Sequence, residues 1–450
     1  MTDYRRLRVA LLGAGAVGSQ VAALLRAHAD ELAERAGARL ELAGIAVRDV
    51  DAPRSAELPR ELLTTDAETL IVGSDIVIEL IGGIEPARTY VLQAINSGAD
   101  VVTGNKALLA THGAEIFDAA DQVGASVSYE AAVAAAIPII RPLRDSLAGD
   151  RVHRIIGIVN GTTNYILDRM DREGAELADV LADAQRLGYA EADPTADVEG
   201  YDAAQKAAIL ASLAFHTNVP LDAVHREGIT GITKGMMDAA RHAGYVIKLI
   251  AVCERMVDGE DGTPIGEAVS VRVYPALIAR SHPLANVHGV NNAVFVEAEA
   301  AGNLMFYGAG AGGMQTASAV LGDVVSAARR HLAGGVGVGE SARASLPVLE
   351  IGRVVTRYQI ILEVDDRPGV LATVAGILSE GHVSIATVEQ TINADGATGV
   401  ERAPEGESGR ARLVIGTHTA REQDLSETVE RLATSGVVER VVSVLRVEGE

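Results

Sequence analysis

The sequence contains a single cysteine, Cys253, among its 450 residues. An intramolecular disulfide is therefore impossible, and a zinc site built from several cysteines is excluded. The eleven histidines include no pair in the HExxH spacing of metal-binding helices. This cysteine usage is typical of a reducing compartment, so we expect a cytoplasmic protein.

Basic residues and long hydrophobic runs are also scarce. The chain has 39 Lys and Arg against 61 Asp and Glu, which gives a formal net charge of -22. Nucleic-acid binding needs clustered Lys and Arg, and no such block occurs, so we expect no nucleic-acid partner. The apolar stretch at 131–140 contains a proline and is too short to cross a bilayer, so we expect no membrane span.

The N-terminal segment has the pattern of a dinucleotide-binding turn. A hydrophobic strand precedes Gly13, Gly15 and Gly18, which are in GxGxxG register with Ala16 and Val17 between them. A helix follows, and a second strand at 38–49 closes a βαβ unit. Such glycines allow a tight turn and a close approach of the backbone to a pyrophosphate. The hexapeptide alone also fits an ordinary glycine-rich turn, but the flanking elements favour nucleotide binding.

Further strands are predicted at 75–83, 99–110 and 124–133, with helices between them. Strands that alternate with helices predict an α/β fold with a doubly wound parallel sheet, here a Rossmann-type domain over 1–134. Ligands bind beyond the carboxyl ends of such strands. The residues expected near a cofactor are therefore Gly82, Gly83, Thr103, Asn105 and Lys106.

The rest of the chain divides into two further domains. Residues 135–303 predict a mixed α+β domain for substrate binding and catalysis, and 304–332 predict a glycine-rich turn and a helix that pack back on the first domain. Linker composition follows, and we take 333–355 as the linker. Residues 356–450 predict a ferredoxin-like βαββαβ domain, with a mobile hairpin extension near 393–410.

Residues 200–213 predict a helix with a lysine on its apolar face. Lys206 shares that face with Ile209, Leu210 and Leu213, and Asp202 lies four residues before it. Most such ion pairs lie on solvated faces, and a lysine can also keep its head in water while its stem lies on apolar surface. A buried lysine beside a carboxylate has a tunable pKa and suits general acid/base catalysis.

An acidic turn comes just before this helix. Glu191, Asp193, Asp197 and Glu199 lie within nine residues, and Pro194 prevents a continuous helix. Acidic turns are usually solvated loops, but next to a catalytic lysine these carboxylates could bind a substrate ammonium group. Together with the nucleotide turn, this pattern predicts hydride transfer on an alcohol or carbonyl of an amino-acid-like substrate.

The sequence resembles homoserine dehydrogenases of the long bacterial type with a C-terminal ACT domain. The resemblance spans residues 6–450. The segments that carry it are GAGAVG (13–18), ELIGG (79–83), VVTGNKALLA (101–110), SYEAAV (128–133), GIVNGTTNYIL (157–167), LGYAEADPTADVEGYDAAQKAAILA (187–211) and GAGAGGMQTASAVLGD (308–323).

This resemblance implies interconversion of L-homoserine and L-aspartate 4-semialdehyde with NAD(P), in threonine, methionine and isoleucine biosynthesis. Lys206 would be the proton donor and acceptor, assisted by Asp202, and Lys106 would be a second essential lysine near nicotinamide and substrate. The resemblance also implies substrate binding by four residues, Glu191, Asp202, Asp197 and Thr162.

The same resemblance implies further ligands and partners. Gly188 and Gly312 would contact the cofactor. A monovalent cation, usually sodium, would be bound by the side chain of Glu130 and the carbonyls of Val133, Ala135 and Ile137. This chain has alanines where relatives often have glycines, and alanine adopts a positive φ less easily. The ACT domain implies feedback by L-threonine or a purely structural role, and relatives suggest a homodimer or homotetramer.

Cofactor choice is partly visible at the end of the second strand. Arg48 precedes Asp49 there, and an arginine at this place favours the 2′-phosphate of NADP. We expect NADP, with NAD tolerated, unless Arg48 is only a solvated loop residue. Two other functions stay open at this stage: an NAD(P) oxidoreductase for another amino-acid-like alcohol, and an amino-acid sensor without turnover.

Overall fold

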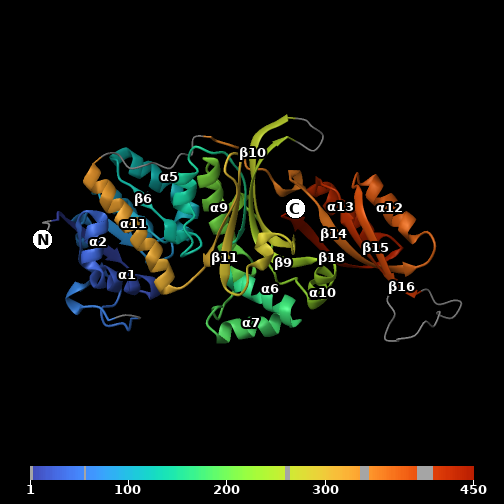
Figure 1. The fold of residues 1–450 in the computed structure, drawn as a ribbon, viewed down its shortest axis with the longest axis horizontal. Coiled ribbons are helices and arrows are strands. Elements are labelled where there is room, and N and C mark those ends of the chain that lie inside the picture. Colours follow the sequence, from blue (N-terminus) through green and yellow to red (C-terminus); the bar gives the residue numbers. More distant parts are fainter. Residues whose placement is uncertain (1–3, 55–56, 259–263, 335–343, 393–408, 450) are drawn as a thin grey trace.

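The computed structural model describes residues 4–54, 57–258, 264–334, 344–392 and 409–449. They form three domains in a row, with the N-terminal and C-terminal domains at opposite ends and a sheet-rich domain between them (Figure 1). The predicted Rossmann-type, α+β and ferredoxin-like architecture is thus confirmed. Within the described residues, no helix is both long enough and apolar enough to span a membrane.

The first domain is a parallel sheet with helices on both faces. Its strand order is β3-β2-β1-β4-β5-β6. Alternate residues of β1 enter two different cores, because Ala10 and Leu12 pack on one face while Val9 and Leu11 pack on the other. The strand order reverses between β1 and β4, which makes the carboxyl ends of these strands the natural ligand crevice. The elements are β1 (Arg6–Leu12), α1 (Ala16–Ala27), α2 (Ala29–Ala36), β2 (Arg39–Ala46), β3 (Leu63–Thr64), α3 (Ala67–Val72), β4 (Ile76–Glu79), α4 (Ala87–Asn96), β5 (Asp100–Thr103), α5 (Lys106–Val123) and β6 (Val127–Ser128).

The predicted strand at 99–110 was wrong beyond Thr103. Strand β5 ends at Thr103, and α5 begins at Lys106. The Asn105 side chain caps this helix by accepting a hydrogen bond from the Leu108 N–H at 3.1 Å. Lys106 therefore sits at the first turn of a helix, at the carboxyl end of the sheet.

The central domain has a mostly antiparallel sheet. Its strands lie in the order β12-β11-β7-β9-β10. Helix α9 packs on β9 and β10, and α6 packs on β9 and β11. The elements are β7 (Val152–Ile158), α6 (Gly161–Glu173), α7 (Leu177–Arg186), α8 (Thr195–Val198), α9 (Tyr201–Phe215), β8 (His225–Arg226), α10 (Lys234–His242), β9 (Tyr245–Asp258), β10 (Pro264–Ala279), β11 (Asn291–Ala298) and β12 (Gly302–Ala309).

The segment that returns to the first domain is shorter than the predicted 304–332. Strand β12 reaches Ala309 and pairs with β11, so it belongs to the central sheet. Only α11 (Gly313–Ala333) lies against the first domain, where it packs on α1, α2, β4 and β5. In Figure 1 this orange helix lies among the blue elements of the N-terminal domain.

The C-terminal domain has the βαββαβ order predicted from its sequence. Its sheet order is β18-β14-β16-β15, and β18 also pairs in parallel with β10 of the central domain. One sheet therefore runs through both domains. The predicted hairpin extension falls mainly on 393–408, and much of the predicted linker falls on 335–343; both ranges lie outside the described residues. The elements are β13 (Val355–Thr356), β14 (Tyr358–Asp366), α12 (Val370–Glu380), β15 (Ile385–Ile392), β16 (Gly409–Thr417), β17 (Ala420–Arg421), α13 (Glu422–Thr434) and β18 (Val438–Glu448).

Candidate functional site

Helix α9 is buried on nearly all sides. Eleven of its fifteen residues are buried, so the single apolar stripe predicted from the sequence describes only part of its surroundings. Gly200, at φ +78°, precedes the helix, and Asp202 lies in its first turn, where the positive end of the helix dipole favours a carboxylate. Lys206 lies one turn later, with 9% of its surface exposed. This burial contradicts both the solvated-pair and the snorkelling alternatives.

Two lysines meet at Asp202. The Lys206 Nζ lies 2.6 Å from Asp202 Oδ2, and the Lys106 Nζ lies 3.1 Å from Asp202 Oδ1. Lys206 also donates to the Val159 carbonyl at 2.6 Å. The Lys106 side chain is 38% exposed, whereas those of Lys206 and Asp202 are 11% and 12% exposed. The cluster of Lys106, Asp202 and Lys206 is thus accessible to solvent at Lys106 and buried at Lys206.

The carboxyl group of Asp202 is held in its ionised form. Burial by itself would raise its pKa, but the nearby charges of Lys206 and Lys106 and a hydrogen bond from Asn160 outweigh burial and lower the pKa far below its ordinary value. Asp202 is therefore a fixed negative charge across the working pH range. It holds both ammonium groups in place.

Asn160 joins this cluster to the acidic turn. Its Nδ2 donates to Asp197 Oδ1 at 2.6 Å and to Asp202 Oδ2 at 3.0 Å. Its Oδ1 accepts from the Thr163 N–H at 2.8 Å and so caps α6. Sequence reasoning missed this residue, although it lies in the GIVNGTTNYIL segment that carries part of the resemblance. The available signal was an Asn immediately after a strand and before a helix.

The other predicted substrate residues lie at different depths around the cluster. Burial raises the pKa of Asp197, and the charge of Asp202 adds to this effect. Thr162 donates to the Tyr189 carbonyl at 2.8 Å, which holds the turn containing Gly188 against the start of α6. Glu191 is exposed, and its carboxylate forms no hydrogen bond or ion pair with any residue that the structure describes. It is available to a ligand, but it is not part of the closed cluster.

The glycines of the first turn fit a dinucleotide. A Cβ on Gly18 would lie 2.0 Å from the Gly13 carbonyl, and one on Gly13 would lie 2.6 Å from the Leu80 carbonyl, so these two glycines are needed for packing. A Cβ on Gly15 would meet nothing within 4 Å. Gly15 opens onto free space at the start of α1, directly before Ala16 and Val17, where a pyrophosphate would need to approach the backbone.

A buried glutamate shapes the next part of this crevice. Glu79 has no exposed surface; it accepts from the Ile81 N–H at 2.8 Å and from the Thr103 hydroxyl at 2.6 Å. It therefore ties the turn that contains Gly82 to the turn that leads to Lys106. The Thr103 hydroxyl points inward and donates to Glu79, so it helps to hold Glu79 in place and does not face the crevice. Sequence reasoning missed Glu79 because it lies within an apolar strand.

The remaining cofactor candidates are Gly312, Arg48 and Gly188. A Cβ on Gly313 would lie 2.7 Å from the Ala16 carbonyl, so the start of α11, with Gly312 as its cap, abuts the start of α1. Arg48 is exposed just beyond the end of β2. Gly188 is exposed at φ +77°.

The predicted cation site does not fit its carboxylate ligand. Glu130 is 1% exposed, and its two oxygens accept from the N–H groups of Ile139, Ile140 and Arg141 and from the Arg141 side chain. Four donors use the lone-pair directions of a carboxylate. Ala135 does adopt φ +48° despite its side chain. The described residues also contain no cluster of three His, Cys, Asp or Glu suited to a metal ion.

Comparison with known proteins identifies the family. The model of homoserine dehydrogenase matches residues 138–325, that of its NAD-binding domain matches 13–130, and that of the ACT domain matches 358–435. The chain is 53% identical to the homoserine dehydrogenase of Corynebacterium glutamicum over 98% of this chain and 95% of that protein.

Solved structures agree with this result. A homoserine dehydrogenase from Thiobacillus denitrificans covers 99% of this chain and 98% of its own, with TM-score 0.87 and 37% identity. A hyperthermophilic archaeal homoserine dehydrogenase in complex with NADPH covers 74% of this chain and 99% of its own, with TM-score 0.59 and 25% identity. The resemblance predicted from the motifs is confirmed, and the chain belongs to the homoserine dehydrogenases, oxidoreductases that act on a CH–OH group.

Proposed function

We propose that this protein interconverts L-homoserine and L-aspartate 4-semialdehyde with NADP, in the biosynthesis of threonine, methionine and isoleucine. The observation that carries the proposal is the buried Lys206–Asp202 pair beside Lys106 and the glycine-lined crevice. Such a lysine can move a proton at the substrate oxygen while the cofactor handles hydride.

In this proposal Lys206 serves the reacting hydroxyl. Two of its three N–H donors go to Asp202 and to the Val159 carbonyl, which leaves the third for the substrate oxygen. Asp202 stays ionised and orients both lysines. Lys106, at the first turn of α5, would stabilise negative charge on the oxygen during the reaction.

The acidic turn would bind the amino-acid end of the substrate. The carboxylates of Asp197 and Glu191 would bind its ammonium group, and Thr162 would line the site beside them. Asp197 is supported in this role by its hydrogen bond from Asn160, which keeps it next to Asp202. Glu191 is supported by its exposed and unengaged carboxylate.

NADP would bind along the crevice. The backbone of Gly13, Gly15, Ala16, Val17 and Gly18 would hold the pyrophosphate, and the exposed Arg48 would meet the 2′-phosphate. Gly82, Gly188 and Gly312 would border the rest of the molecule, whereas the buried Thr103 would act only by holding Glu79 in place. When bound, the nicotinamide supplies or accepts the hydride. NADPH in the archaeal relative is consistent with this preference. No step depends on a cation, because Glu130 already accepts four hydrogen bonds.

Oxidation of NADPH by L-aspartate 4-semialdehyde tests the proposal. We expect Lys206→Ala to lower turnover by about 10²-fold or more, because it removes the general acid/base. Lys234→Ala, at an exposed lysine on α10, is the matched control and should retain the wild-type rate. A Lys206→Ala variant near the wild-type rate would contradict the mechanism. No turnover in the wild type would contradict the substrate assignment.

We also propose that the ACT domain binds L-threonine and lowers activity. Gly369, at φ +94°, precedes α12, so the N–H groups at the start of this helix can meet a carboxylate. Binding there can reach the central domain, because Glu448 of β18 contacts Arg272 at 3.6 Å and Tyr274 at 2.5 Å. Added L-threonine should slow the reaction; unchanged kinetics would contradict feedback by this ligand.

A further inference from the structure

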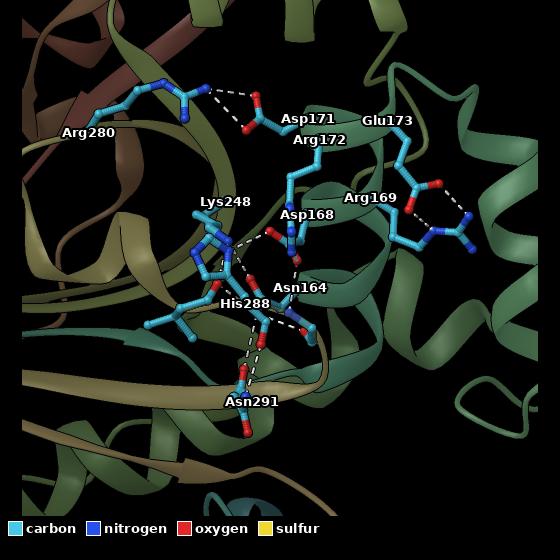
Figure 2. A network of polar contacts seen from close by, with 12 residues as sticks. Asn164, Asp168, Arg169, Asp171, Arg172, Glu173, Lys248, Arg280, His288 and Asn291 are labelled. Atoms are coloured by element: carbon cyan, nitrogen blue, oxygen red, sulfur yellow. Dashed lines mark hydrogen bonds and ion pairs between the residues drawn. The ribbon is translucent and has the colours of Figure 1, made fainter.

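Besides the proposed active site, the protein has a polar cavity near the end of helix α6 that lies away from the catalytic cluster. Helix α6 begins next to Asn160, and the cavity lies near its C-terminal half, about 12–16 Å further along the helix at 1.5 Å per residue. The cavity has a volume of about 300 Å³. The ionisable residues of its lining are Asp168, Asp171, Arg172, Lys248, Arg280 and His288 (Figure 2).

Lys248 is a buried lysine in this lining, and it has no direct ion pair with any residue that the structure describes. It is 2% exposed, and its Nζ donates to Asn164 Oδ1 at 2.8 Å and to the Val287 carbonyl at 2.7 Å. Both acceptors are neutral, and no carboxylate of the described residues lies within ion-pair distance of it. A buried charge without a counter-charge is unfavourable. The carboxylates of Asp168 and Asp171 act on this charge only from beyond ion-pair distance, so Lys248 has a third N–H donor and no direct ion pair with a described residue at the wall of the cavity.

The same cavity also contains two negatively charged groups, the carboxylates of Asp168 and Asp171. Asp168 is 7% exposed and accepts from His288 Nδ1 at 2.7 Å and from the Gly289 N–H at 3.0 Å. Asp171 accepts from Arg280 at 2.9 and 3.1 Å, and its Oδ1 lies 3.5 Å from Arg241 Nε. These two carboxylates lie one helical turn apart on α6, on the side that Figure 2 shows toward His288 and Arg280. Arg172, whose side chain is 65% exposed, lies 3.9 Å from Asp168.

We propose that this cavity binds a small zwitterionic α-amino acid, with its carboxylate at Lys248 and its ammonium group toward Asp168 and Asp171. The cavity has the charges for both ends of such a molecule, and Leu167, Val246 and Ala285 provide apolar surface for a short side chain. A volume of about 300 Å³ is at the lower end of the range for small-molecule sites. A multivalent anion such as phosphate would match the cations of the lining but would meet two carboxylates, whereas a zwitterion matches charges of both signs.

Equilibrium dialysis of the full-length protein with radiolabelled L-alanine tests the proposal. We expect saturable binding in the wild type and an affinity lower by about tenfold or more in Lys248→Met, because a charge-assisted hydrogen bond is removed. Arg172→Ala changes only an exposed residue, so it should fold. It removes a cation that competes with the ligand ammonium group for Asp168, so it should strengthen binding by up to several-fold. Lys234→Met, at an exposed lysine, should bind like the wild type.

Two comparisons separate this cavity from other sites. Binding here should survive Asp202→Asn and Glu191→Gln, because those residues belong to the proposed substrate site. Acetate and ethylamine, which each carry one of the two charges, should compete poorly with L-alanine. The proposal is overturned by an absence of binding at millimolar L-alanine, by binding that Lys248→Met leaves unchanged, or by weaker binding in Arg172→Ala. Loss of binding in the two substrate-site variants or preferential binding of inorganic phosphate would overturn it as well.

Discussion

Asn160 and Asp202 are joined by a 3.0 Å hydrogen bond, and the same amide nitrogen of Asn160 also donates to Asp197 at 2.6 Å. One side chain thus holds two buried carboxylates that would otherwise repel each other. Asp202 in turn binds the two lysines. The position of the proposed catalytic cluster of Asp202, Lys206 and Lys106 therefore depends on a residue that carries no charge.

Two variants of Asn160 separate this bridging role from helix capping. Asn160→Ala removes both the cap of α6 and the bridge, whereas Asn160→Asp keeps a capping oxygen but replaces the bridging donor with a third carboxylate. We expect both to lower kcat/KM, by up to about 10²-fold, because the reacting groups are misplaced. Steady-state kinetics with L-homoserine measures this. An Asn160→Asp variant with wild-type kcat/KM would show that capping alone matters.

Arg48 should determine the choice between the two nicotinamide cofactors. We expect Arg48→Ala to raise KM for NADPH about tenfold, since it removes a charged hydrogen bond to the 2′-phosphate, and to leave KM for NADH nearly unchanged. Arg35→Ala, at an exposed arginine on α2, serves as the control. Equal effects of Arg48→Ala on both cofactors would show that the residue is only a solvated part of its loop.

Glu130 should act in stability rather than in cation binding. Glu130→Gln places an amide among four N–H donors and removes one of the two carboxylates beside Arg141, so we expect a loss of about 3 kcal/mol in the free energy of unfolding. Calorimetry measures the change, with the exposed Glu299→Gln as control. Exchange of sodium for tetramethylammonium at equal ionic strength should leave the wild-type Tm unchanged; a clear decrease would instead support Glu130 as a sodium ligand.

The features that followed from the sequence are those that short-range geometry determines. The GxGxxG turn is set by local backbone demands at Gly13 and Gly18, and the approach of Lys206 to Asp202 is set by the helical repeat. Lys106 meets Asp202 only because helix α5 of the first domain packs against helix α9 of the central domain, and no local pattern encodes this contact.

Glu79 and Asn160 were missed for the same reason: their contacts include residues that are distant in the sequence. Glu79 binds turns at the ends of two neighbouring strands, and Asn160 binds carboxylates that follow it by 37 and 42 positions. The boundary near 304 was misplaced because β12 and the glycine-rich turn after it form one continuous apolar and small-residue segment. Only the pairing of β12 with β11 assigns it to the central sheet.

Lys248 should make stability depend on pH in the alkaline range. Burial lowers its pKa from 10.5 to about 8; the charges of Asp168 and Asp171 act in the opposite direction, and Arg280 acts with burial. Between these values the unfolded chain binds more protons than the folded one, so stability rises with pH. This contribution is fully present above pH 10.5 and is lost as the pH falls toward 8.

Comparison with Lys248→Met isolates this effect, because the other titrating groups are common to both proteins. From pH 8 to 10.5 the free energy of unfolding of the wild type should rise relative to that of the variant by about 3 kcal/mol. Urea unfolding in buffers free of amino acids measures the difference, and Lys234→Met should give a curve parallel to that of the wild type. A constant difference between wild type and Lys248→Met over this range would mean that the buried ammonium keeps an ordinary pKa, so that solvent or an unrecognised anion already compensates its charge.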